Sequence, residues 1–233
     1  MVAVTHSISP SASPSSALEL LCAGLIPDDA QRVALAHEWV QTLYADRTLG
    51  TGEAVLQHAL GTALIAASLR LDADTRLAAL CFAVGDALPH PIEEVASRYG
   101  EGVAQLVDGL RRLNGLRVIT RTTTTATAPE IRAQSEVLRK MLLAMVEDIR
   151  VVLLRVASRT QTLRYFTDHP GKTRDAVARE SLDIYAPLAN RLGIWQLKWE
   201  VEDLSFRFLE PDTYKRIARM LDERRVEREQ FIV

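Results

Sequence analysis

The fold is decided by the stretch LRKMLLAMVEDIRVVLLRVASRTQTLR, residues 138–164. Apolar side chains recur there at spacings of three and four, and others fill the remaining directions: Leu138, Leu142, Met145, Ile149, Val152 and Val156, then Val151, Leu153, Leu154 and Ala157. This pattern is typical of a helix buried on every side. The polar pair Glu147-Asp148 predicts a break, with Asp148 as N-cap of a helix starting at Ile149. Residues 155–164 are expected to emerge from the core with polar groups, where a helical protein would place a site.

The composition indicates a folded domain without a strongly charged surface. Of 233 residues, 48% are hydrophobic and 25% charged, which suffices for one large domain or two small ones. A formal net charge of -2 gives no support for direct nucleic-acid binding. Cys22 and Cys81 stand outside any metal-binding spacing, so we expect reduced thiols in a cytoplasmic protein.

The beginning of the chain favours neither a membrane span nor a signal peptide. No apolar run in the sequence reaches the roughly 18 residues that a span requires, so we expect no membrane contact. Residues 1–16 contain no charge, two prolines and six serines, whereas a signal peptide begins with positive charge and an apolar segment. We therefore expect residues 1–16 to form a disordered tail.

Helical periodicity, capping residues and glycine or proline stops recur through the rest of the chain. They predict helices over residues 30–44, 53–71, 75–87, 92–99, 103–113, 175–192 and 195–209, and one that opens at Pro211. Asp28 or Asp29 is expected to cap the first of these, and Asp72 or Asp74 the third. The inner face of residues 30–44 should carry Val33, Leu35, Trp39, Val40 and Leu43. We expect an all-α fold.

Three further segments need interpretation. Residues 120–127, TRTTTTAT, have β-propensity, but a solitary strand would have no partner, so a surface loop is expected. Trp195 and Trp199 lie four residues apart, which favours core or interdomain packing over a base-stacking platform. The last helix mixes both charge signs around a thin apolar stripe at Ile217, Leu221 and Val226, which is typical of a solvated connector.

Two stretches resemble a known family. Residues 139–159, RKMLLAMVEDIRVVLLRVASR, and 181–211, SLDIYAPLANRLGIWQLKWEVEDLSFRFLEP, resemble the N-terminal half of the RelA/SpoT-type (p)ppGpp synthetase/hydrolases, with similarity over roughly residues 30–233. The resemblance implies an HD-domain-like helical bundle over residues 17–195 and connector helices over 196–233. These connectors would lead to a synthetase domain of the same longer chain, which is the expected partner.

The resemblance also implies where an active hydrolase would hold manganese. In that family the metal has one His, a His-Asp pair and a distant Asp as ligands, and it activates water to remove the 3'-pyrophosphate of the alarmone. His58, in GEAVLQHAL, matches the first ligand, but Phe82-Ala83 stand at the His-Asp pair and Ser158 at the distant Asp. Asp86-Ala87 stand where the family has a catalytic Glu-Asp pair, and Gln161 and Thr162 replace a nearby His and Asn. We therefore expect no catalytic residue, no metal and no cofactor, with His58 as a vestigial ligand.

These departures indicate a catalytically inactive, hydrolase-like regulatory domain of a (p)ppGpp synthetase. Two alternatives remain open: an active manganese-dependent (p)ppGpp hydrolase with another ligand set, and a guanine-nucleotide-sensing module. Candidate nucleotide-binding residues are Arg155, Arg159 and Arg164, because Arg pairs bidentately with phosphate, although such residues more often form intramolecular salt bridges. His58 is otherwise a satisfied structural histidine, Asp86 a turn residue, and Phe82 a residue that fills the former metal site.

Overall fold

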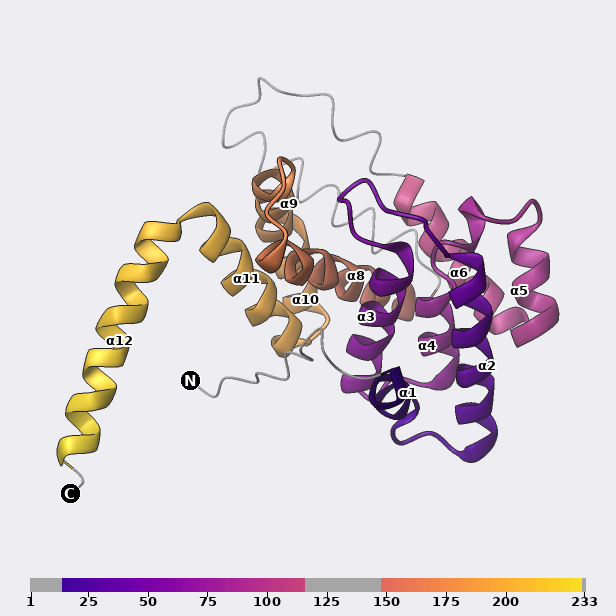
Figure 1. Cartoon of the computed structure of the whole chain (residues 1–233), viewed down its shortest axis with the longest axis horizontal. Helices are drawn as coiled ribbons and strands as arrows, with labels where there is room; N and C mark the ends of the chain where they lie inside the picture. The colour runs from indigo at the N-terminus through magenta and orange to yellow at the C-terminus, as the bar shows by residue number, and fades with distance from the viewer. Residues whose placement is uncertain (1–13, 116–147, 232–233) are drawn as a thin grey trace. The chain divides into compact units, whose positions relative to one another are not determined.

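The protein is built from α-helices. The computed structural model describes residues 14–115 and 148–231, and within these ranges it has no strand, only an isolated bridge between Thr48 and Ala54 (Figure 1). This confirms the predicted all-α class. The described residues fall into two compact units, which we call the first unit (residues 14–115 with 148–158) and the second unit (residues 159–231).

The first unit is organised around a short buried helix. Its elements are α1 (Pro14–Cys22), α2 (Pro27–Leu43), α3 (Val55–Ser68), α4 (Ala73–Leu80), the 3-10 turn η1 (Val84–Asp86), α5 (Pro91–Tyr99), α6 (Glu101–Gly115) and the part of α8 (Ile149–Asp168) that ends at Ser158. Helix α4 contacts α2, α3 and α6. All its residues except Asp74 are buried, which explains its central place. The start of α1 at Pro14 lies inside the segment expected to be a tail.

Helix α4 begins as predicted but ends early. Asp72 is its N-cap, and its Oδ1 accepts a hydrogen bond from Thr75 N at 2.9 Å. The predicted continuation to Ala87 is wrong, because the helix ends at Leu80. Continuation would require Val84 N to bond Leu80 O, but Val84 N bonds Cys81 O and the Tyr44 hydroxyl donates to Leu80 O at 3.0 Å. The turn that follows therefore carries Phe82 and Ala83.

Helix α2 corrects two further predictions. It begins at Pro27 with Ile26 as N-cap, so neither Asp28 nor Asp29 caps it. Pro27 at the first helical position has no N–H that would need a partner, and both aspartates lie in the first turn, where the helix dipole favours them. Leu35, expected on the inner face, is 54% exposed, and Ala36 and His37 are buried in its place.

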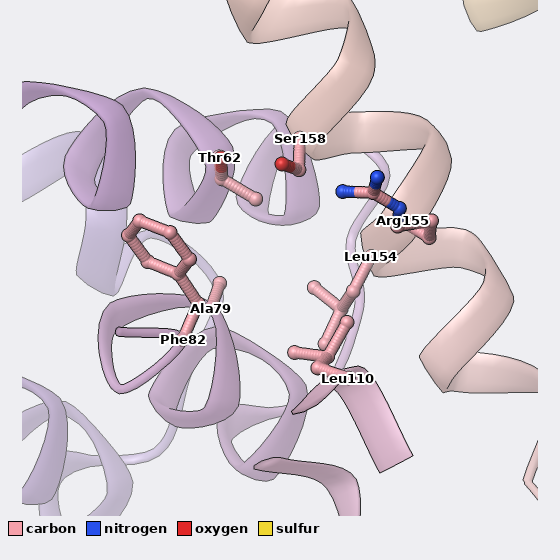
Figure 2. Close-up of a pocket in the computed structure, with 7 residues that line it drawn as sticks. All are labelled: Thr62, Ala79, Phe82, Leu110, Leu154, Arg155 and Ser158. Carbon is pink, nitrogen blue, oxygen red and sulfur yellow. The ribbon is translucent and has the colours of Figure 1, made fainter. Parts of the chain in front are cut away.

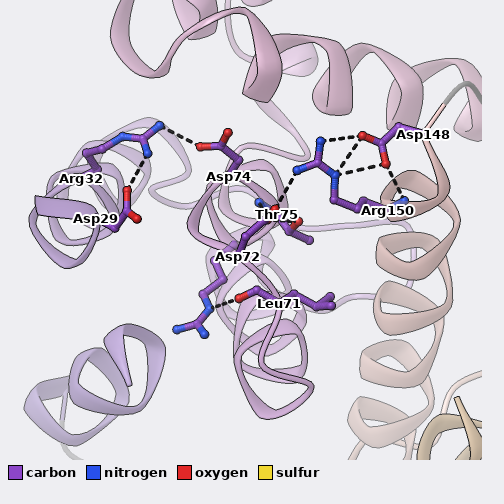
Figure 3. Close-up of polar contacts among 9 residues, drawn as sticks. Asp29, Arg32, Leu71, Asp72, Asp74, Thr75, Asp148 and Arg150 are labelled. Carbon is purple, nitrogen blue, oxygen red and sulfur yellow. Dashed lines mark hydrogen bonds and ion pairs between the residues drawn. The ribbon is translucent and has the colours of Figure 1, made fainter. Parts of the chain in front are cut away.

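Two arginine-centred contacts join the first turn of α4 to its neighbours, one to α8 and one to α2 (Figure 3). Arg150 Nη1 donates to Asp72 Oδ2 at 2.8 Å, and its Nη2 donates to Asp148 Oδ2 at 2.6 Å. Asp148 Oδ1 also accepts from Arg150 N at 2.9 Å, which confirms that Asp148 caps a helix starting at Ile149. Arg32 lies between Asp29 and Asp74 in the same manner. Helix α8 is thus attached to the buried α4 by charged side chains.

Helix α8 is buried along much of its length. Val151, Val152, Leu154, Val156 and Ala157 are nearly inaccessible in the first unit. The expectation that residues 155–164 emerge from the core is wrong, because Arg155, Arg159 and Thr160 are also buried. The polar groups of Arg155, Arg159 and Thr160 are therefore internal, and each has to be satisfied by the protein.

The second unit consists of the rest of α8 and four further segments. They are α9 (Arg174–Glu180), the π-helical η4 (Ser181–Tyr185) with α10 (Ala186–Arg191), α11 (Trp195–Leu209) and α12 (Pro211–Phe231). Helix α12 contacts α11. Together, α9, η4 and α10 cover residues 174–191, where the sequence predicts a helix over 175–192. The π-helical turn η4 divides this helix in two. The core contains Leu163, Phe166, Val177, Ala178, Ala186, Val201 and Phe208. Gly193, with φ +73, makes the predicted turn before α11.

Two expectations for the second unit differ in outcome. Trp195 and Trp199 are 52% and 63% exposed, so their assignment to a core is wrong, while interdomain packing stays a prediction. Ile217 and Leu221 of α12 are also exposed, which confirms a largely solvated helix over the residues whose side chains are described.

In the described ranges, no helix combines the length and hydrophobicity needed to cross a membrane. The loop expected at residues 120–127 and the helical segment at 138–147 lie outside the described residues.

Candidate functional site

His58 is the centre of the candidate site in the first unit. It lies on α3, is 3% exposed, and has a hydrogen bond at each ring nitrogen. Nδ1 lies 2.7 Å from Glu53 Oε2, and Nε2 lies 2.8 Å from Ser158 Oγ on α8. Glu53, which is 2% exposed, sits just before α3 in a loop closed by its own carbonyl oxygen accepting from Leu49 N at 2.8 Å.

The chemistry of these three side chains sets the direction of the hydrogen bonds. A carboxylate only accepts hydrogen bonds, so with Glu53 ionised the proton of a neutral His58 ring lies on Nδ1. Nε2 then accepts the hydroxyl hydrogen of Ser158. The three side chains form a chain from carboxylate to imidazole to hydroxyl.

Phe82 and Ala83 stand beside this chain, in the turn after α4. The Phe82 ring centroid lies 5.0 Å from that of His58 and 6.3 Å from that of Tyr44, the latter in an edge-on arrangement. Phe82 is only partly buried. Ala83 N donates to the Tyr44 hydroxyl at 3.2 Å, and burial raises the pKa of Tyr44 far above its usual range. Tyr44 is thus a neutral brace that holds the turn carrying both residues.

A small cavity lies next to Ser158 (Figure 2). It has a volume of about 10 Å³, room for roughly one water molecule. Its lining comes from four parts of the chain: Thr62 of α3; Ala79 and Phe82 of α4 and the turn after it; Leu110 of α6; and Leu154, Arg155 and Ser158 of α8. Figure 2 shows Ser158 and Arg155 on α8 facing Thr62 and Phe82 across this space. The cavity is apolar except for two hydroxyls and one guanidinium.

Asp86 and Ala87 are not brought into this site. Asp86 is exposed at the end of η1 and does not line the cavity. Its backbone oxygen accepts from Arg47 Nη1 at 2.8 Å, so Asp86 helps to form a surface turn. Of the candidate residues named from the sequence, His58, Phe82 and Ser158 therefore lie together in the site. The carboxylate of Asp86 lies outside it.

The residues present do not fit the manganese ion that the resemblance implies. A hard divalent cation needs several carboxylate, imidazole or water donors that converge on one point. In residues 14–115 and 148–231, no group of three or more His, Cys, Asp or Glu side chains is placed to hold a metal. The one imidazole here has both nitrogens engaged, and an aromatic ring and a hydroxyl occupy its other sides. No chemical step through a metal follows from this arrangement.

The three candidate nucleotide-binding arginines lie in different surroundings. Arg155 is 7% exposed and lines the cavity of the first unit. In the second unit, Arg159 Nη2 lies 2.9 Å from Glu180 Oε2 with its guanidinium 4.5 Å from the Tyr185 ring centre. Arg164 donates to Glu200 through Nη2 at 2.8 Å. Arg159 and Arg164 thus make intramolecular ion pairs, and nucleotide binding by these residues stays a prediction.

Sequence reasoning missed Glu53 as a member of the site. A carboxylate before an apolar helix is ordinarily interpreted as favouring the helix dipole, and five residues separate it from His58. The loop that returns its side chain to His58 uses positive φ at Asp46 (59) and Gly52 (89). The two glycines before it, Gly50 and Gly52, were the local signal of a turn.

Comparison of the sequence with known proteins shows its family. Residues 36–195 match the model of the HD domain. The chain is 40% identical to GTP pyrophosphokinase of Escherichia coli K12 over 198 residues, which are 85% of this chain and 26% of that protein. GTP pyrophosphokinase of Photobacterium angustum is 42% identical over 72% of the chain and 22% of its own length. The bifunctional (p)ppGpp synthase/hydrolase SpoT of E. coli K12 is 34% identical over 92% of the chain and 29% of its own length.

The chain therefore spans less than a third of the length of these curated relatives. The match covers α3, the turn after α4, and α8, which are the elements that carry His58, Phe82 and Ser158. The chain belongs to the HD-domain family, as the HD domain of a RelA/SpoT-type protein.

Proposed function

We propose that this chain is a hydrolase-like HD domain that is inactive towards (p)ppGpp and that regulates a (p)ppGpp synthetase of the GTP pyrophosphokinase type. The observation that carries the proposal is the bonding of His58 to Glu53 and Ser158 with the Phe82 ring beside it. Relatives named both as GTP pyrophosphokinases and as a bifunctional synthase/hydrolase match the chain, so similarity does not choose between them. The donor chemistry of the site favours the inactive form.

The regulatory part of the proposal has support in the second unit. Trp195 and Trp199 of α11 and Ile217, Met220 and Leu221 of α12 are large apolar side chains that are 43–63% exposed. The rings of Trp195 and Trp199 lie together, with their centroids 6.5 Å apart, and an exposed aromatic pair of this kind favours a site of protein contact. A synthetase domain of the same longer chain is the partner that we propose for it. The cytoplasmic location expected from the sequence stays a prediction.

The first experiment incubates the purified protein with ppGpp and manganese, and follows GDP release and protein-bound metal together. We expect neither turnover nor stoichiometric metal. The E. coli SpoT protein, treated in the same way, is the positive control for hydrolysis. Turnover that disappears in His58→Ala would overturn the inactive assignment and identify an active metal-dependent hydrolase.

A second experiment tests regulation. The matching 198-residue region of E. coli GTP pyrophosphokinase is replaced by this chain, and (p)ppGpp synthesis is compared between the chimera, the parent and a version with that region deleted. We expect the chimera to restore the rate or its activation relative to the deletion. Equal rates and equal activation in the chimera and the deletion would contradict a regulatory role.

A further inference from the structure

The hydrogen-bonded chain at His58 has the order of a nucleophile-activating relay. A buried carboxylate, Glu53, orients the imidazole through Nδ1 at 2.7 Å. The opposite nitrogen, Nε2, lies 2.8 Å from the Ser158 hydroxyl oxygen. Nucleophilic serines are recognised by this arrangement, in which a base contacts the hydroxyl and a third group fixes the base, and the arrangement recurs on unrelated folds with Asp or Glu as the third member.

We propose that Ser158 is a nucleophile, activated by His58 and positioned through Glu53, that accepts small acyl groups from esters. The inference goes beyond the proposed function, because it concerns a covalent reaction that needs no metal and a different class of substrate. Ser158 differs from its two partners in exposure: it is only partly buried, whereas Glu53 and His58 are 2% and 3% exposed. Ser158 is therefore the least buried of the three residues, and its side chain lines the cavity.

The neighbouring cavity defines the substrate class. Its wall of Phe82, Leu110 and Leu154 is apolar, and its volume of about 10 Å³ suits a group only slightly larger than water. The space is smaller than an acetyl group and far smaller than a guanine nucleotide, so it favours the shortest acyl groups, which would enter only with movement of the lining side chains. Arg155 lines the same cavity, so its guanidinium lies near the position where negative charge would develop on the carbonyl oxygen.

The reaction balances without an additional cofactor. Ser158 Oγ attacks the ester carbonyl carbon while its proton passes to His58 Nε2, which gives a tetrahedral oxyanion beside Arg155. The carbonyl re-forms as the bond to the leaving alcohol breaks, and His58 returns the proton to that alcohol. An acetyl-Ser158 ester remains. Water, deprotonated by His58, can then attack this ester and release acetate, which regenerates the serine.

The test uses p-nitrophenyl acetate as the acyl donor and the whole protein. Nitrophenolate release is followed in time, and the acetylated residue is located by mass spectrometry of the digested protein. We expect about one acetyl group per chain on Ser158, and none at that site in Ser158→Ala. Glu53→Gln keeps the shape of the side chain but removes the carboxylate, and should slow acetylation of Ser158 by about 100-fold.

Ser68→Ala is the matched control. Ser68 lies at the exposed end of α3, and its hydroxyl donates to Ile65 O at 2.7 Å instead of to an imidazole. We expect no acetylation of Ser68 and no change of rate in this variant. Cooperative thermal unfolding of each variant shows that it is folded.

Two results would overturn the proposal: no acetyl group on Ser158 of the folded protein, or the same rate of acetylation in Glu53→Gln. A second measurement does not require entry of a reagent. The proton NMR spectrum should contain a strongly downfield Nδ1–H resonance that is lost in Glu53→Gln, and its absence from the unaltered protein would also contradict the relay. Because none of these readouts involves ppGpp or manganese, the inference and the proposed function can fail separately.

Discussion

His58 and Ser158, a hundred positions apart in the sequence, are joined by a hydrogen bond of 2.8 Å between Nε2 and Oγ. The contact fixes α8 to α3 at the last residue that α8 contributes to the first unit. The next residue, Arg159, pairs with Glu180 and lies over the ring of Tyr185 in the second unit. Consecutive residues of one helix thus hold polar partners in each of the two units.

Replacing Ser158 by Ala should destabilise the first unit by about 1–3 kcal/mol, because the buried Nε2 acceptor loses its donor. Urea unfolding followed by circular dichroism measures the loss. Ser68→Ala, at the exposed end of the same partner helix, should change the free energy of unfolding by less than about 0.5 kcal/mol. Equal effects of the two substitutions would show that the His58 contact contributes nothing to stability.

Removing the Tyr44 hydroxyl should cost about 1–3 kcal/mol of unfolding free energy. That hydroxyl donates to Leu80 O and accepts from Ala83 N, and Tyr44 is 2% exposed, so Tyr44→Phe leaves two buried backbone groups without their partner. Tyr214→Phe is the control, since its hydroxyl makes only a 3.4 Å exposed contact with Asp203. A Tyr44→Phe protein as stable as the control would refute the bracing role.

Much of the helical architecture could be predicted because it depends on local chemistry. Periodic apolar residues, the caps Asp72 and Asp148, and the prolines that begin α5 and α12 act within a few residues of one another. The predicted end of α4 was wrong for a non-local reason. The Tyr44 hydroxyl, 36 positions away from Leu80, takes the carbonyl that the next helical turn would use.

The candidate site could be predicted only in part, because some of its contacts are also non-local. Resemblance singled out His58, Phe82 and Ser158, and the structure brings these three together. It could not reveal Glu53, whose contact with His58 depends on a loop with two positive-φ residues. Nor could it reveal that Arg155 and Arg159 are buried, since long charged side chains are ordinarily assigned to the surface.

Gly109 is required for the close approach of α6 to α8. A Cβ atom placed there would lie 2.8 Å from Val151 Cγ2, and a β-branched side chain has little freedom to move away. Gly109→Ala should therefore destabilise the protein by about 1–3 kcal/mol, although Ala is the better helix former.

Gly102→Ala in the same helix provides the control for Gly109. Its nearest neighbour would be Asp74 Oδ2 at 3.5 Å, an ordinary contact, so we expect stabilisation of up to about 1 kcal/mol. Thermal or urea unfolding of the two variants compares them directly. A stabilising effect of Gly109→Ala would show that the two helices can separate without cost.

Acid should loosen the attachment of α8 to α4, and Arg150 should set the pH at which this happens. Burial opposes ionisation of Asp72, but hydrogen bonds from Thr75 and the charge of Arg150 lower its pKa below 3.8. Hydrogen bonds from Arg150 likewise lower the pKa of Asp148. Because both pKa values are lower in the folded protein, their contribution to stability is complete above about pH 4 and is lost as the pH falls through the folded values.

Arg150→Gln should return both pKa values towards 3.8 and move the midpoint of acid unfolding to higher pH, as measured by circular dichroism at fixed ionic strength. Arg98→Gln removes an exposed pair with Glu94 on α5 and should leave the midpoint almost unchanged. High salt should reduce the difference between the two variants, since both aspartates are partly exposed. If the two variants unfold at the same pH, carboxylates elsewhere in the chain govern acid unfolding.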